Sequence, residues 1–173
     1  MPVLLISGST RAASSNTALL RTLAALEPDH VTFDVDALTV LPHFNPDDDR
    51  DPLPAPVTAL RSAIAAADAV LFCTPEYAGT LPGSMKNLLD WTVGGTELTD
   101  KPVAWLNAAA DPRRGAGAQA TLATVLGYVQ ARIVEDACRS VPVPAGSIGT
   151  DGLIADDDVH AALRDVLARL RSG

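Results

Sequence analysis

A polar loop close to the start of the chain has the residue types that bind a phosphate group. It reads Gly8-Ser9-Thr10-Arg11-Ala12-Ala13-Ser14-Ser15-Asn16-Thr17 and leads into a segment with helical apolar spacing. Hydroxyls, amides at a helix N-terminus and one guanidinium are what a terminal phosphate monoester needs. The GxGxxG and GK[ST] signatures of other nucleotide-binding loops are absent. The alternative is a simple helix cap, but a cap needs one such side chain and this loop has six besides the arginine.

The cysteines argue against a phosphatase built on this loop. A low-molecular-weight phosphatase shares the loop geometry but needs a nucleophilic cysteine within it, and this loop has none. Cys73 and Cys138 stand alone, with no CxxC pair and no histidine at metal-binding spacing. We therefore predict two reduced thiols, with Cys73 buried.

A second unusual loop reads Thr74-Pro75-Glu76-Tyr77-Ala78-Gly79-Thr80-Leu81-Pro82-Gly83. Two glycines, two prolines and an aromatic residue in so short a stretch predict a rigid wall rather than a flexible lid. A planar heterocycle can lie against such a wall while backbone groups contact its polar edge. The alternative is a structural turn in which Tyr77 is a surface aromatic.

The segments around these loops alternate between short apolar runs and helical periodicity. We predict strands at 3–6, 31–35, 69–73 and 103–106, a fifth strand within 132–141, and helices at about 16–26, 57–67, 82–93, 119–131 and from 156 to the C-terminal region. This pattern predicts one α/β domain over residues 1–173, a flavodoxin-like, doubly wound, five-stranded parallel sheet of order 2-1-3-4-5 with helices on both faces. In that order the ligand site lies between strands one and three, which the two unusual loops follow.

Composition excludes several classes of partner. The 173 residues, 47% apolar and 20% charged, fit one globular domain. A net charge of -8 with only two lysines excludes a nucleic-acid partner. No apolar run can span a bilayer and no basic leader begins the chain, so we expect a cytoplasmic protein without a membrane partner. The acidic stretch 47–51 lacks the glycine and closing glutamate of a calcium loop, so we predict a solvated loop and no metal site.

Both loops resemble signatures of the NADPH-dependent FMN reductases, which include flavin-dependent quinone and azo-dye reductases. The pattern G-S-x-R-x-x-S-x-N is matched by Gly8, Ser9, Arg11, Ser14 and Asn16. The pattern P-E-Y-N-G-x-x-P-G-x-x-K-N-x-x-D-W is matched by Pro75, Glu76, Tyr77, Gly79, Pro82, Gly83, Lys86, Asn87, Asp90 and Trp91. The resemblance covers nearly the whole chain. Ala78 replaces the family's asparagine, and residues 107–112 replace a Ser/Gly-rich stretch, which leaves the acceptor and the flavin potential open.

The resemblance implies a flavoenzyme that uses FMN to pass electrons from NADPH or NADH to a small acceptor such as FMN or a quinone. It implies a phosphate site of Ser9, Arg11, Ser14, Asn16 and Thr17, and a ring site of Pro75, Glu76, Tyr77, Ala78 and Gly79 that acts largely through backbone groups. The cofactor supplies the chemistry, so no catalytic side chain is expected. Lys86, Asn87 and Asp90 either serve the site or are structural, braced against neighbouring loops or a second subunit. A homodimer or homotetramer, with contacts on the third and fourth helices, is also implied.

Two other functions stay open from the residues alone. One is an electron carrier or redox sensor that holds FMN but does not oxidise a nicotinamide, and the other is a phosphate-ligand domain without flavin. The loop after the fourth strand contains Arg113 and Arg114. We hypothesise that one of them contacts the 2′-phosphate of NADPH; the alternative is two solvated arginines.

Overall fold

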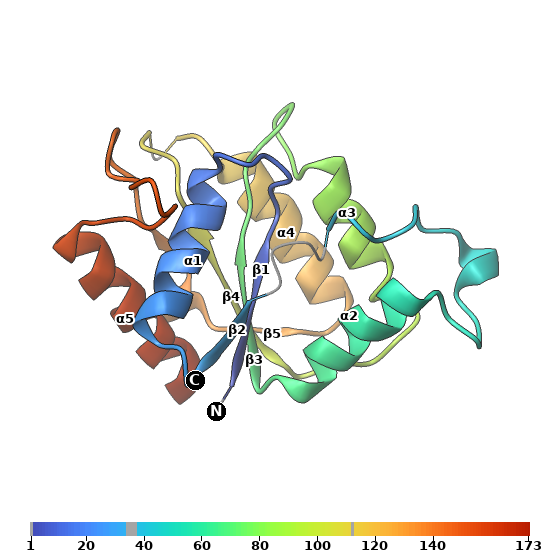
Figure 1. Cartoon of the computed structure of the whole chain (residues 1–173). Helices are drawn as coiled ribbons and strands as arrows, with labels where there is room; N and C mark the ends of the chain where they lie inside the picture. The colour runs from blue at the N-terminus through green and yellow to red at the C-terminus, as the bar shows by residue number, and fades with distance from the viewer. Residues whose placement is uncertain (1, 34–37, 112) are drawn as a thin grey trace.

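A parallel β-sheet runs through the middle of the molecule (Figure 1). The computed structural model describes residues 2–33, 38–111 and 113–173. The strand order is β2-β1-β3-β4-β5, which confirms the prediction. The strands are β1 (Val3–Ser7), β2 (Val31–Phe33), β3 (Ala69–Cys73), β4 (Pro102–Asn107) and β5 (Arg132–Ile133), with β6 (Arg139–Ser140) also paired to β4. Ser7 pairs with Cys73, and Cys73 with Leu106, so the three central strands end at one level.

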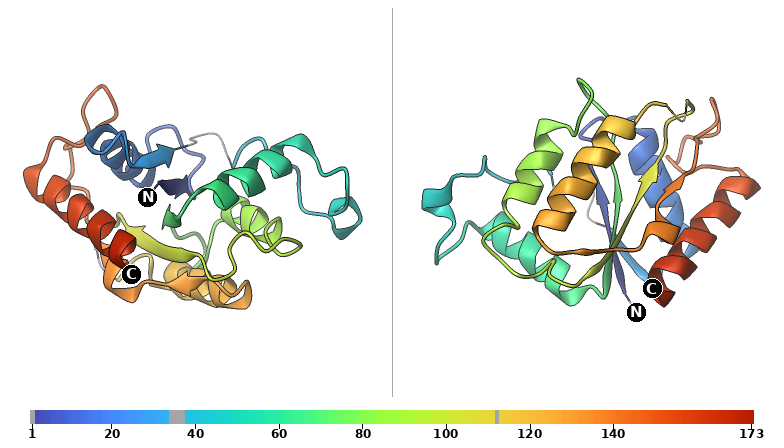
Figure 2. Two further views of the ribbon diagram at one scale, coloured as in Figure 1. Left: turned by 90° about the horizontal axis from the view of Figure 1, so that it is seen from below. Right: turned by 180° about the vertical axis from the view of Figure 1, so that it is seen from behind.

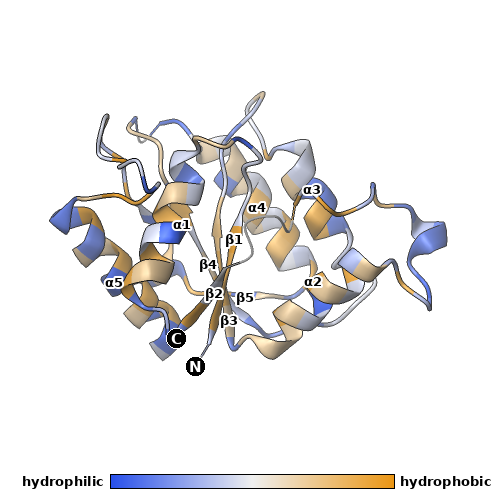
Figure 3. Ribbon diagram, in the orientation of Figure 1, coloured by the Kyte–Doolittle hydropathy of each residue, from blue (hydrophilic) through white to orange (hydrophobic). Residues whose placement is uncertain are grey.

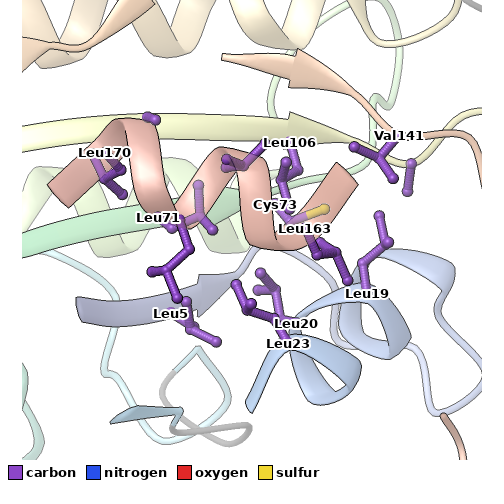
Figure 4. Close-up of a cluster of buried hydrophobic side chains, with 14 of the residues drawn as sticks. Leu5, Leu19, Leu20, Leu23, Leu71, Cys73, Leu106, Val141, Leu163 and Leu170 are labelled. Atoms are coloured by element: carbon purple, nitrogen blue, oxygen red, sulfur yellow. The ribbon is translucent and has the colours of Figure 1, made fainter. Parts of the chain in front are cut away.

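Helices cover both faces of the sheet (Figure 2). They are α1 (Ser15–Leu26), α2 (Ala55–Ala66), α3 (Gly83–Asp90), α4 (Ala116–Tyr128) and α5 (Asp157–Ser172). Alternate strand side chains point to opposite faces. Leu5, Leu71 and Leu106 pack with α1 and α5 on one face (Figure 4), and Ile6 and Phe72 pack with the other three helices. The strands are accordingly apolar along their length, whereas α5 carries both hydrophilic and apolar residues (Figure 3). None of the described helices is long and apolar enough to cross a membrane.

The fifth strand and helix α3 differ from the predictions for physical reasons. The fifth strand lies within the predicted range, but a 3₁₀ turn, Glu135–Ala137, divides it into β5 and β6, because the turn buries Ala137 while its two acidic residues stay in solvent. Helix α3 is shorter than predicted. Pro82 is its extended N-cap residue, and the Thr92 hydroxyl bonds the Leu89 carbonyl just past its end. Residues 34 and 35 of the predicted second strand lie outside the described part of the chain.

The acidic loop is more firmly attached than a solvated loop would be. The Asp49 carboxylate accepts a 2.7 Å hydrogen bond from the guanidinium of Arg61, and both side chains are nearly buried. Arg61 also donates to the Trp91 carbonyl over 2.8 Å. Asp47 and Asp48 do face solvent, as predicted. The prediction therefore fails at Asp49, whose side chain ties the loop to α2.

Candidate functional site

Three loops meet at the carboxyl edge of the sheet, at its upper end in Figure 1. They follow β1, β3 and β4, and they enclose a cavity of about 540 Å³, within the usual range for small-molecule sites. Nine of the ten site residues expected from the sequence line this cavity: Ser9, Arg11, Ser14, Asn16, Pro75, Glu76, Tyr77, Ala78 and Gly79. Thr17 is not among the lining residues. The structure thus brings the two motif loops to one place.

Gly8 allows the first two loops to approach each other. Its amide donates to the Cys73 carbonyl over 2.8 Å and so continues the ladder between β1 and β3. A Cβ atom at position 8 would lie 2.1 Å from the Thr74 hydroxyl oxygen and 3.0 Å from the Thr74 Cα. Any side chain here would push the β1 loop away from the β3 loop and widen the cavity between them.

The β1 loop contains both a helix cap and groups that remain for an anion. The Ser14 hydroxyl accepts a 3.3 Å hydrogen bond from the Thr17 amide, so the simple-cap interpretation holds for this residue. The amides of Ser15 and Asn16 lie in the first turn and have no intrahelical acceptor. The Arg11 guanidinium is exposed. Within the described part of the chain it makes one hydrogen bond, of 2.7 Å, to the backbone carbonyl of Ala13. Guanidinium and amides together suit a phosphate monoester.

Two residues of the expected phosphate site support the loop from beneath. The Thr17 hydroxyl is buried and lies 2.8 Å from the Ser7 hydroxyl. The Asn16 side-chain oxygen accepts a hydrogen bond from the Cys73 thiol, 3.3 Å away. Burial raises the pKa of Cys73 far above its usual range, so this thiol stays protonated and is no nucleophile. Cys73 is buried, as predicted. Thr17 holds the loop in shape and contacts the cavity at no point.

Glu76 attaches the β3 loop to the start of α4. Its carboxylate accepts hydrogen bonds from the amides of Gly117 (2.7 Å) and Ala118 (3.1 Å), where the helix dipole favours negative charge. A Cβ atom at Gly117 would lie 2.0 Å from the Gly79 carbonyl oxygen. Only a glycine therefore permits this approach. The sequence motif placed Glu76 beside the ring, and the structure shows how its side chain holds the wall in position.

The wall ends in a tight turn at Ala78 and Gly79. The backbones of Tyr77 and Thr80 exchange hydrogen bonds of 3.0 and 3.1 Å, and the two residues between them have φ of 51° and 75°. Positive φ at both central positions is the type I′ arrangement, for which Asn-Gly is favoured. The Thr80 and Thr121 hydroxyls, 2.8 Å apart, fasten the turn to α4. The family's asparagine thus fits the backbone conformation that Ala78 must adopt here.

Ala78→Asn is expected to stabilise the protein by about 1 kcal/mol, because alanine in the left-handed region is strained by roughly 1–2 kcal/mol and asparagine much less. For a chain of this size that is a rise in Tm of about 2–4 °C. Ala78→Gly, which relieves the strain but adds freedom to the unfolded chain, should give a smaller gain. Calorimetry checks both. An unchanged or lowered Tm in the asparagine variant would contradict the backbone explanation.

The β4 loop is organised by Asn107, a buried residue that sequence reasoning did not select. Its side-chain amide donates to the Arg114 carbonyl (2.8 Å) and its oxygen accepts from the Ala109 amide (3.1 Å). The available signal was a polar residue at the end of an apolar strand. Asp111 binds Arg113 through two side-chain hydrogen bonds, which lower the pKa of this carboxyl below its usual value. The neighbouring Arg114 lines the cavity.

The remaining motif residues brace the fold in this chain. The Asn87 side chain accepts a hydrogen bond from the Phe44 amide (2.7 Å) and donates one to the Pro42 carbonyl (2.9 Å). The Trp91 indole donates to the same carbonyl over 2.8 Å. Phe44 and Trp91 pack edge to face with ring centres 5.0 Å apart. Lys86 and Asp90 form an ion pair along α3, and neither lines the cavity. The bracing alternative therefore describes Asn87, whereas Lys86 and Asp90 pair with each other along their own helix.

Known proteins with similar sequences and structures point to one family. A model of the NADPH-dependent FMN reductases matches residues 1–143. The chain is 30% identical over 171 residues to an NAD(P)H-dependent FMN reductase of Pseudomonas aeruginosa, covering 98% of this chain and 92% of that protein. It is also 30% identical over 167 residues to a 2-hydroxy-1,4-benzoquinone reductase of a Burkholderia species, and this match covers 95% of this chain and 91% of that protein.

A solved structure agrees with these relatives. FerB, a flavoenzyme NAD(P)H:(acceptor) oxidoreductase from Paracoccus denitrificans, superposes with a TM-score of 0.79 at 28% identity, covering 99% of this chain and 97% of FerB. The cavity lies at the switch point of the strand order, where doubly wound sheets bind their ligands, and both matched motifs contribute to its lining. The chain belongs to the NADPH-dependent FMN reductase family and is an NAD(P)H-dependent flavin oxidoreductase with FMN as its cofactor.

Proposed function

We propose that FMN lies in the central cavity with its phosphate at the β1 loop and its ring against the β3 loop, and that the final acceptor is a quinone. The observation that carries this placement is one cavity with an arginine and free first-turn amides on one side and a rigid backbone turn on the other. FMN, when bound, supplies the electron transfer between the reduced nicotinamide and the acceptor. A quinone acceptor is supported by the Burkholderia relative named above.

The protein's own groups bind and orient in this account. Arg11 and the amides at the start of α1 hold the phosphate, and Ser9 shapes that loop by accepting from the Arg11 amide at 3.3 Å. Glu76 and Thr80 fix the wall to α4. The Glu76 carboxylate accepts two backbone amides and the Asp111 carboxylate binds Arg113, so the structure gives both groups a positioning role. We therefore assign no catalytic side chain.

Tyr77→Ala is expected to weaken FMN binding modestly and to slow reduction of a quinone more strongly. The Tyr77 side chain is 55% exposed at the cavity and offers a flat apolar surface, and a stacked aromatic pair contributes about 0.5–1.5 kcal/mol beyond area burial. Tyr77→Phe keeps that surface and should behave like the parent. Stopped-flow reduction by NADPH, followed by reoxidation with a quinone, reports the two half-reactions separately. A large loss in either rate for the phenylalanine variant would mean that the hydroxyl takes part in the chemistry.

Steady-state oxidation of NADPH by the purified, FMN-loaded protein with a quinone tests the enzyme assignment. The proposal expects sustained turnover without any added reductase. An electron carrier would instead turn over only when a partner reductase is supplied, and a domain that binds no flavin would stay colourless after incubation with FMN. Either result would overturn the proposed function.

We also propose that the described chain acts as one FMN-binding unit in a cytoplasmic homodimer or homotetramer. The exposed Tyr128 on α4 (77%) and Val93 just after α3 (46%) support contacts on these helices, because exposed apolar side chains are favoured at interfaces. Dependence on reduced nicotinamides, which are intracellular metabolites, supports the location. Sedimentation analysis tests the oligomeric state, and a monomer would contradict the proposal. Cell fractionation tests the location, and a secreted protein would contradict it.

A further inference from the structure

Two arginines reach the cavity from loops that lie apart on the sheet. Arg11 follows β1 and Arg114 follows β4. Strand β3 lies between β1 and β4, so the two loops start about 10 Å apart, two strand spacings. In the proposed complex, the FMN phosphate pairs with Arg11 of the β1 loop. A second cation at the far side of the same cavity is left for a different anionic group.

Arg113 and Arg114 are adjacent in sequence but differ in their surroundings. The Arg113 guanidinium is bound to both carboxylate oxygens of Asp111, at 3.1 and 2.9 Å, and its side chain is 89% exposed. The Arg114 guanidinium makes no hydrogen bond or ion pair to the rest of the described chain, and Arg114 is the one of the pair that lines the cavity. Asp111 thus holds Arg113 in solvent. Arg114 is close enough to help lower the pKa of Asp111, but its guanidinium makes no hydrogen bond to that carboxylate and stays available.

The backbone at Arg114 is held in place before any ligand binds. Its carbonyl accepts the 2.8 Å hydrogen bond from Asn107, a buried residue at the end of β4. The following Gly115 has φ of 96°, and a Cβ atom there would lie 2.7 Å from the Asn107 side-chain oxygen. The Arg114 side chain therefore starts from a fixed point at the sheet edge. A preorganised contact loses less entropy when the ligand binds.

The nearby helix terminus is already partly occupied by a carboxylate of the protein. The first amides of α4, at Gly117 and Ala118, already bond the Glu76 carboxylate. An anion entering this side of the cavity would find its strongest partner in the guanidinium, whose planar fork matches phosphate oxygens. NADPH and NADH share every group except the 2′-phosphate. A contact between Arg114 and that phosphate would therefore strengthen the binding of NADPH and not that of NADH.

We infer that Arg114 is a specificity-determining residue that binds the 2′-phosphate of NADPH and makes the enzyme prefer NADPH to NADH. This inference rests on the proposed function, because it assumes that the donor enters the cavity that holds FMN. It also assigns different roles to the two adjacent arginines: Arg114 recognises the donor, and Arg113 does not.

Calorimetric titration of the FMN-loaded protein with NADP⁺ and NAD⁺ tests the inference by binding alone. We expect the parent to bind NADP⁺ more tightly than NAD⁺, and Arg114→Ala to weaken NADP⁺ binding by about tenfold or more while NAD⁺ binding changes by less than about twofold. Arg113→Ala removes the same charge one residue away and should change neither. Equal losses for the two nucleotides, no loss in the Arg114 variant, or the same loss in the Arg113 variant would overturn the inference.

Steady-state kinetics distinguish two anionic groups that Arg114 could bind, the 2′-phosphate of the donor and a negative charge on the acceptor. With a neutral quinone, Arg114→Ala should raise the KM for NADPH and leave that for NADH unchanged. If instead only the KM for an anionic quinone rises, the residue recognises the acceptor and the inference is wrong. If the parent oxidises neither nicotinamide, the proposed function fails, whereas the titration still reports on Arg114.

Discussion

Replacing Arg11 with alanine is expected to weaken FMN binding by about tenfold or more and to leave riboflavin binding unchanged. A hydrogen bond to a charged group contributes about 1.5–3 kcal/mol, and riboflavin lacks the phosphate that would receive it. Arg11 is the one arginine of the β1 loop and lines the cavity. Quenching of flavin fluorescence on titration with protein measures both dissociation constants.

Arg21→Ala is the matched control for this variant. Arg21 is exposed on α1 and does not line the flavin cavity, so its removal changes the net charge equally without touching the loop. FMN should bind this control as it binds the parent. Arg11→Lys, which keeps the charge but loses the planar fork, should fall between the parent and the alanine variant. Parent-like FMN affinity in Arg11→Ala would show that the phosphate lies elsewhere.

Gly117→Ala is expected to lower FMN affinity by about tenfold or more and to cost about 1–3 kcal/mol of stability. The new methyl would lie 2.0 Å from the Gly79 carbonyl oxygen and 3.1 Å from the Glu76 carboxylate. The backbone oxygen cannot be avoided by a change of rotamer, so the β3 loop must move off α4, and overpacking of this kind costs about that amount. Thermal unfolding and flavin titration measure the two effects.

Gly127→Ala on the same helix provides the control. A Cβ atom at position 127 meets nothing within 4 Å. Alanine has the higher helix propensity, so this variant should gain about 0.5–1 kcal/mol and bind FMN like the parent. If both alanine variants bind FMN normally, the contact between the β3 loop and α4 does not support the ring site.

The central strands could be predicted closely because the pattern that marks them lies within each short segment of the sequence. An uninterrupted apolar run such as Ala69–Cys73 is buried on both faces of a parallel sheet, and its bounds in the structure are those predicted. The parallel sheet followed from the alternation of strands and helices, and its order was taken from the flavodoxin-like fold. The position of the site followed as well, since loops after the first and third strands must meet at the switch in strand order.

Elements that depend on distant partners were predicted less well. Helix α4 begins at Ala116, three residues before the predicted start, because the Glu76 carboxylate from another loop caps its first amides. The fifth strand is split at a turn whose position depends on the burial of Ala137 against α5 and β4. Neither contact leaves a local pattern in the sequence.

Within the candidate site, residue type indicated location better than role. Thr17 was expected in the phosphate site, but its hydroxyl bonds that of Ser7 under the loop. The sequence showed only that Ala78 replaces the family's asparagine, whereas the structure shows that this residue has a φ of 51° in a turn that favours asparagine. Asn107 was not selected because its two partners, Ala109 and Arg114, become neighbours only when the β4 loop folds back.

A crystal structure of the FMN complex tests the account most directly. We expect the phosphate within about 3 Å of the Arg11 guanidinium and of the amides of Ser15 and Asn16, which is hydrogen-bonding distance, with the ring against the Tyr77–Thr80 turn. The β3 loop should stay attached to α4 through Glu76. A flavin bound elsewhere, for example between α1 and residues 148–155, or a phosphate that makes no contact with the β1 loop, would contradict the central claim.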